Sequence, residues 1–206
     1  MAITYHAGRR LQGLSLTATD TTFTSIANAD ASYITLGGGS GAGATKIGFY
    51  VETGHALVGG DLKTITFTMS KYGTVSGNGY AAVYNSSGTQ KGSNSSTNDW
   101  GTLPQGSNVN KTFTFSTPIS IANGDRIVVE GGSFNTSNQI DVYYDGTSPP
   151  DAYTGGVHYT GSSWTNVSTV DAHFVATYDA ISGDTKPTNV QAGSRFEETD
   201  TRKMYH

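Results

Sequence analysis

Residues 62–69 have the sequence LKTITFTM, in which two sets of side chains alternate strictly. A period of two is typical of a half-buried β-strand, because successive side chains of an extended chain point to opposite faces. Leu62 would share one face with three threonines. The other face would hold Lys63, Ile65, Phe67 and Met69. We expect Lys63 to mark the solvent-exposed end of this strand.

Similar alternating or apolar runs recur along the chain and are separated by turn residues. They lie at residues 45–51, 80–84, 112–115, 118–121, 126–130, 139–144, 157–159 and 172–178. Asn123-Gly124-Asp125 and Asp145-Gly146 are strong turn signals between them. No segment shows convincing helical periodicity. The sequence therefore predicts an all-β fold, a single jelly-roll β-sandwich of about eight antiparallel strands.

The composition agrees with an all-β chain. Glycine occupies 27 of 206 positions, and charged residues make up only 14 %. Gly, Ser, Thr and Asn are poor helix formers but suit short strands and tight turns. The 12 Tyr, 8 Phe and 2 Trp residues supply large side chains for a core, which excludes a disordered chain. Cysteine is absent, so the fold uses no disulfide.

Charge and hydropathy exclude two classes of partner. The formal net charge is −4. Nucleic-acid binding is not expected, because phosphate recognition needs clustered Lys and Arg. No window of about 18 apolar residues occurs, so no membrane span is expected either.

Three regions are expected: an N-terminal arm at 1–19, the sandwich at 20–180, and a C-terminal linker and interaction arm at 181–206. The N-terminal arm is mildly basic, and residues 194–206 hold many charges of both signs. The C-terminal segment is either a solvated, frayed end or an arm that docks on a neighbouring subunit. Under the second interpretation, the subunit contacts are expected from Arg9, Arg10, Arg195, Phe196, Arg202, Met204 and Tyr205.

The sequence lacks the residue patterns of the common enzyme sites. Residues 37–46 (GGGSGAGATK) resemble a phosphate loop but lack its Gly-Lys-Ser/Thr ending. No Gly-x-Ser-x-Gly elbow occurs, and no spacing singles out a carboxylate pair for glycoside hydrolysis. The five histidines show no zinc-ligand spacing. We therefore expect a protein that is not an enzyme.

Two kinds of ligand stay open. No cofactor is expected, except that a structural Ca²⁺ would use aspartates at strand edges, and these are Asp61, Asp125, Asp141 and Asp171. Sugar binding would use aromatic faces beside polar groups, although core packing is the usual role of such residues. The candidates for glycan contact are Trp100, Tyr144, Tyr153 and Trp164.

The order of motifs suggests a family. Residues 47–51, a Gly-rich turn and residues 62–69 precede a Trp-centred loop at Trp100 and the run FTFSTPISIANGD at 113–125. YTGG at 153–156, Ser163-Trp164 and a strand at 171–178 follow. This series resembles a jelly-roll domain of prokaryotic surface proteins and phage structural proteins, similar in architecture to carbohydrate-binding modules. The end segments, 8–13 and 193–203, resemble those of viral surface proteins.

The resemblance implies a virion structural protein, such as a capsid decoration, spike or tail-surface subunit. Its partners would be further copies of the chain, other virion proteins and a host-surface glycan. Residues 1–6 lead into polar sequence without the apolar segment of an export signal, which favours synthesis in a host cytoplasm and a place on the virion surface. The alternatives are a carbohydrate-binding module of an extracellular or cell-surface protein, and a subunit of a cell-surface filament or sheath.

Overall fold

The alternating run at 62–69 forms part of β4 (Asp61–Tyr72), around which the first of two sheets is built. β8 (Val109–Ser120) pairs with one edge of β4. β14 (Phe174–Ala180) and β10 (Gln139–Asp145) pair with successive parts of its other edge. The sheet is completed by β1 (Thr19–Thr24) on β14, and by β2 (Ser32–Leu36) and β13 (Asp171–Ala172) on β10.

The second sheet has β3 (Lys46–Val51) and β9 (Arg126–Glu130) at its centre. β11 (Thr154–Tyr159) and then β12 (Trp164–Val167) extend it beyond β3. On the other side, β9 pairs with β5 (Asn78–Tyr84), whose far edge holds β6 (Gln90–Lys91) and β7 (Thr97–Asp99). The short 3₁₀ helix η2 (Trp100–Thr102) follows β7.

The computed structural model describes residues 19–25, 32–37, 43–145, 154–180, 196–197 and 204–205. Ala18–Ile181 form one unit, which contains both sheets. The remaining residues form a second unit, in which the structure describes only β15 (Phe196–Glu197) paired antiparallel with β16 (Met204–Tyr205). Apart from these short strands and Thr19, the predicted arms lie outside the described residues.

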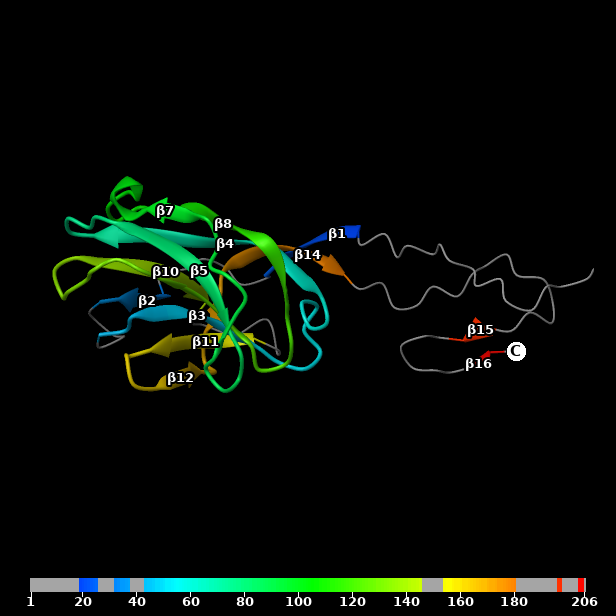
Figure 1. Cartoon of the computed structure of the whole chain (residues 1–206). Helices are drawn as coiled ribbons and strands as arrows, with labels where there is room; N and C mark the ends of the chain where they lie inside the picture. The colour runs from blue at the N-terminus through cyan, green and yellow to red at the C-terminus, as the bar shows by residue number, and fades with distance from the viewer. Residues whose placement is uncertain are drawn as a thin grey trace, which may run out of the picture. The chain divides into compact units, whose positions relative to one another are not determined.

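The chain passes back and forth between the two sheets, which lie face to face in Figure 1. Strands far apart in sequence are neighbours, such as β3 beside β9 and β4 beside β14. This antiparallel two-sheet arrangement is a jelly roll, and the predicted fold class is confirmed. Each sheet holds seven strands within the described residues, more than expected. The excess arises because three positions in the sheets are each occupied by two short strands, which are β1 and β2, β14 and β10, and β6 and β7. In addition, the β11–β12 hairpin extends one edge of the second sheet.

Alternate side chains of the two sheets meet in a continuous apolar interior. β3 contributes Ile47, Phe49 and Val51, and the rings of Phe49 and Phe174 stack with centroids 4.0 Å apart. Burying one such side chain stabilises the fold by about 1.5–3 kcal/mol, so this interior is the main source of stability.

One detail of β4 differs from the prediction. The pairing of β4 shifts register between Leu62 and Thr64, as at a β-bulge. A bulge inserts one residue and so reverses the alternation of faces beyond it. Leu62 is therefore fully buried in the core, on the same side as Ile65, and not beside the threonines. Lys63 projects outward and pairs with two carboxylates.

Candidate functional site

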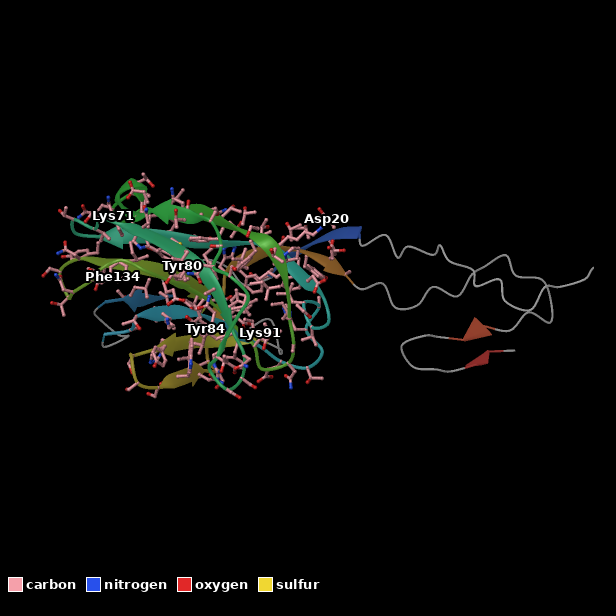
Figure 2. The ribbon with its side chains drawn as sticks, viewed as in Figure 1. Asp20, Lys71, Tyr80, Tyr84, Lys91 and Phe134 are labelled. Atoms are coloured by element: carbon pink, nitrogen blue, oxygen red, sulfur yellow. The ribbon has the colours of Figure 1, made fainter. Side chains whose placement is uncertain are left out.

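The two ends of the sandwich differ in chemistry. The chain-end pole is where β1 begins and β14 ends, together with the loops at 52–60 and 121–125. The loop pole comprises the loops at 73–77, 100–108 and 131–138. Figure 2 shows Asp20 at the first end, and Lys71 and Phe134 at the opposite end.

Trp100 joins the three loops of the loop pole. It is completely buried, and its indole Nε1–H donates a hydrogen bond to the carbonyl oxygen of Gly131 at 3.0 Å. Its backbone N–H donates to the carbonyl oxygen of Gly77 at 2.8 Å. A Cβ atom added to Gly79 would lie 1.5 Å from the indole ring, so a glycine is required beside it. Trp100 therefore holds the loop at 73–77 through its backbone N–H and the loop at 131–138 through its indole ring.

Asparagine side chains fix the same loops from within. Asn135 Oδ1 accepts hydrogen bonds from the backbone N–H groups of Ser137 and Asn138, at 2.9 and 3.0 Å. Asn138 Oδ1 accepts from the backbone N–H of Thr74 at 2.7 Å, which ties one loop to the next. Such side-chain turns replace the ladder bonds that loops lack. The loop pole is therefore a bonded unit.

The surface of the loop pole is uncharged. Residues 72–79, 100–110 and 131–139 contain no Asp, Glu, Lys or Arg. Tyr72 is 55 % exposed and is the one large hydrophobic side chain that is exposed among the residues that the structure describes. Lys71, at the base of the pole, donates to the carbonyl oxygen of Gly101 at 2.6 Å. The pole therefore presents hydroxyl groups, amide groups and one aromatic ring.

The chain-end pole is charged instead. The Lys63 ammonium pairs with Asp179 Oδ1 at 2.7 Å and also with Asp20. The hydrogen bond from Lys63 lowers the pKa of Asp20. Lys91 Nζ lies 2.6 Å from Asp125 Oδ2, which also accepts the backbone N–H of Ala122. This pairing locks the Asn123-Gly124-Asp125 turn that the sequence predicts.

A third feature is an aromatic cluster on the outer face of the second sheet. The Tyr84 and Trp164 ring centroids are 5.2 Å apart, and those of Tyr159 and Trp164 are 4.9 Å apart. The Arg126 guanidinium lies 5.1 Å from the centre of the Trp164 ring. Glu130 Oε1 accepts a hydrogen bond from the Tyr84 hydroxyl at 2.6 Å. Tyr84 is buried, and Tyr159 and Trp164 are half-buried, so the cluster mainly packs on the outer face of the second sheet.

Lys46 adds a charge to this cluster by pairing with Glu130. Burial by itself would lower the pKa of Lys46, but hydrogen bonds to Glu130 and Tyr84 more than offset it, and the pKa is raised. Burial also raises the pKa of Tyr84. The Lys46 ammonium and the Tyr84 hydroxyl therefore both keep their protons at neutral pH.

The four predicted glycan contacts have different fates. The prediction is wrong for Trp100 and Tyr144, because both side chains are completely buried and present no face to a ligand. Tyr144 donates its hydroxyl proton to the carbonyl oxygen of Gly48 at 2.5 Å. Tyr153 lies outside the described residues. Trp164 is half-buried in the aromatic cluster and is the one member of the set that the structure places at the surface.

The four aspartates proposed for Ca²⁺ do not form one cluster. Asp125 is paired with Lys91, and Asp141 accepts hydrogen bonds from Thr35 and Ser70. Within the described ranges, no group of three or more His, Cys, Asp or Glu residues could hold a metal ion. A Ca²⁺ site built from these aspartates therefore gains no support.

Asp141 is unusual, because it is a carboxylate that is only 6 % exposed on the outer face of the first sheet. Its oxygens accept from Thr35 Oγ1 at 3.2 Å and Ser70 Oγ at 3.5 Å, and no cation pairs with it in the described part of the chain. Burial raises its pKa. Because a buried carboxylate without a counter-ion is costly, we expect this group to lower the stability of the fold at neutral pH.

The predicted arm contacts are largely outside the described residues, which omit Arg9, Arg10, Arg195 and Arg202. The backbones of the other three belong to the short hairpin, in which Phe196 pairs with Tyr205 and Glu197 with Met204. The arm role therefore stays a prediction.

Comparison of the chain with known protein families, with curated proteins and with solved structures finds no match. The structure shows an antiparallel β-sandwich, whereas the resemblance to phage and prokaryotic surface domains stays a prediction. Among the residues that the structure describes, none of the helical segments has the length and hydropathy of a membrane span.

Proposed function

We propose that this protein is a structural subunit of a virus surface, acting by self-assembly. The observation that supports this best is the pairing of β1 with β14, in which Thr19 lies opposite Ala180. Both terminal segments therefore leave the sandwich side by side at the chain-end pole. This arrangement suits a sandwich domain that is anchored in a larger assembly by its N- and C-terminal segments.

The hairpin of β15 and β16 supports an assembly role for the C-terminal segment. Its strands have two residues each and, among the residues that the structure describes, pair with one another and with no other strand. An isolated two-stranded hairpin is marginally stable in water. We propose that it gains stability by docking on a neighbouring subunit or another virion protein, with Phe196, Met204 and Tyr205 as apolar contacts and Arg195 and Arg202 as charged ones.

The surface of the sandwich agrees with this division of roles. Subunit interfaces have apolar centres rich in aromatic residues. Within the described residues, Tyr72 is the one large hydrophobic side chain with high exposure. The described part of the sandwich surface thus lacks an extended apolar patch, which favours assembly through the terminal segments.

Deletion of residues 193–206 tests this proposal. The apolar interior lies in Ala18–Ile181, so the shortened chain should unfold cooperatively near the wild-type temperature. It should sediment as a monomer under conditions where the full chain assembles. A control in which 193–206 are replaced by Gly and Ser of equal length should also fail to assemble. Normal assembly of either variant would contradict the proposed role of the C-terminal segment.

A further inference from the structure

We propose that the loop pole binds an uncharged saccharide, with the Tyr72 ring as the stacking surface. Its use in host attachment rests on the proposed function, because the loop pole is the end of the sandwich opposite the one from which the terminal segments leave (Figure 2). The binding itself is argued from the chemistry of the loops.

Tyr72 lies between two loops. On one side it pairs with Gln139, at the end of the 131–138 loop. On the other side, the backbone of its neighbour Lys71 bonds with Pro104 and Gly106 of the 100–108 loop, at 3.1 and 3.2 Å. Tyr72 therefore lies where β4 meets two loops that are rich in hydroxyl and amide side chains. An aromatic face beside polar groups is the arrangement that binds a sugar ring and its hydroxyls.

The absence of charged residues in the three loops favours an uncharged saccharide over a charged one. Charged ligands are bound most strongly by side chains of opposite charge, Lys or Arg for phosphate, sulfate and carboxylate groups and carboxylates for cations. Three charged residues flank the pole, and each side chain is bonded within the protein. Lys71 Nζ donates to Gly101 O at 2.6 Å, Asp99 accepts from Gly101 N at 2.8 Å, and Lys111 Nζ donates to Thr102 Oγ1 at 3.1 Å. What the loops do offer is amides and hydroxyls, which match the hydroxyl groups of a neutral saccharide.

Gln139 provides a specific polar contact. Its side-chain carbonyl oxygen is buried and has no hydrogen-bond partner within the described residues. A buried acceptor without a partner is costly, so turning the half-buried Gln139 side chain outward to meet a ligand hydroxyl would remove that cost. Gln139 is the cross-strand partner of Tyr72, so one sugar unit would meet both side chains.

The loops are held in one conformation before any ligand arrives. Trp100, Asn135 and Asn138 bond them together. Gly73 and Gly131 adopt φ values of +76° and +98°, which other residues rarely accept. A surface that is already ordered loses little conformational entropy on binding, which favours useful affinity from a small contact area.

The test uses the full-length protein on a glycan array, followed by calorimetry with the glycans bound. The probes are uncharged cello-, malto-, xylo- and galacto-oligosaccharides, with heparin oligosaccharides and sialyllactose as charged counterparts. We expect binding to at least one uncharged series. Tyr72→Ala should weaken it about tenfold, whereas Tyr72→Phe should preserve it, because the ring supplies the stacking surface.

A matched pair of charged substitutions sharpens the test. Thr136→Arg places a cation and a long side chain in the loop pole, and Thr22→Arg places them on exposed β1. Only the first should impair binding, and melting temperatures check that both variants are folded. No binding to uncharged probes, binding only to charged ones, or loss of binding in Trp164→Ala with Tyr72→Ala unaffected would each overturn the proposal.

The two proposals fail separately. Tyr72→Ala should assemble like the wild type, and the chain lacking 193–206 should still bind the saccharide. Loss of saccharide binding on deleting 193–206 would contradict a site in the loop pole.

Discussion

The two poles of this sandwich are built from the same strands but are stabilised in different ways. At the chain-end pole, ion pairs such as Lys91 with Asp125 fix the turns. At the loop pole, a buried indole, positive-φ glycines and asparagine turns do so, without charges in the loops. Ion pairs respond to salt and pH, whereas packing and neutral hydrogen bonds respond little. The poles can therefore be perturbed independently.

The largest expected effect is at the loop pole. Trp100→Ala should lower the free energy of unfolding by about 3–5 kcal/mol, because it empties a fully buried site and leaves the Gly131 carbonyl without its donor. Denaturant unfolding measures this loss. Trp164→Ala, at the half-buried aromatic cluster, is the matched control and should lose clearly less. Equal losses would show that Trp100 is not the main link between the loops.

Gly79→Ala should cost about 3 kcal/mol, the upper end for overpacking, because the added methyl would meet the Trp100 ring. Gly106→Ala is a useful comparison, since nothing lies within 4 Å of its added carbon although its φ is +66°. It should cost only about 1–2 kcal/mol from backbone strain. Thermal unfolding compares the two, and a reversed order would refute the packing explanation.

Asp125→Asn probes the chain-end pole and should cost about 2 kcal/mol, because it removes the charge that Lys91 pairs with while keeping an acceptor for Ala122. The loss should shrink in high salt, since the Lys91 ammonium is partly exposed. The Gly79→Ala loss should not. Equal salt dependence of the two variants would contradict the division between the poles.

Asp141→Asn should have a smaller effect on the free energy of unfolding, and this variant should be stabilised, unlike the preceding ones. The pKa of Asp141 is raised above 3.8 in the folded state by burial, so folding favours its protonated form. The variant should therefore be more stable than the wild type at neutral pH. This advantage should disappear as the pH falls through the folded-state pKa towards 3.8.

Asp20→Asn should show the opposite sign. The hydrogen bond from Lys63 lowers the pKa of Asp20, so its contribution to stability is present above pH 3.8 and is lost as the pH falls through the folded-state pKa. Melting curves of both variants between neutral and acidic pH check the pair. The same sign for both would contradict the description of their surroundings.

The sequence predicts the central strands of both sheets, because alternation and turn residues are local signals. It misses the strands β1, β2, β6, β7 and β12, which lie mostly at the sheet edges. The loop pole is harder to predict, because its contacts join distant segments. Trp100 looks like an exposed turn residue until Gly77 and Gly131 are brought against it. Tyr72 is missed since the clear alternation ends at Met69, although the strand continues to Tyr72.

Tyr144 shows a second limit of the pattern. Tyr143 and Tyr144 are adjacent, so alternation alone does not show which one faces the core. The structure buries Tyr144 completely, bonded to Gly48 across the sandwich. The bulge near Lys63 is equally invisible, because one inserted residue leaves the composition of the strand unchanged.

Hydrogen–deuterium exchange on the full chain, compared between its monomeric and assembled states, tests the central claim most directly. We predict new protection in the terminal segments and the adjoining ends of β1 and β14, with the loops at 73–77, 100–108 and 131–138 unchanged. Protection gained at those loops, with the terminal segments unaffected, would contradict assembly through the chain-end pole.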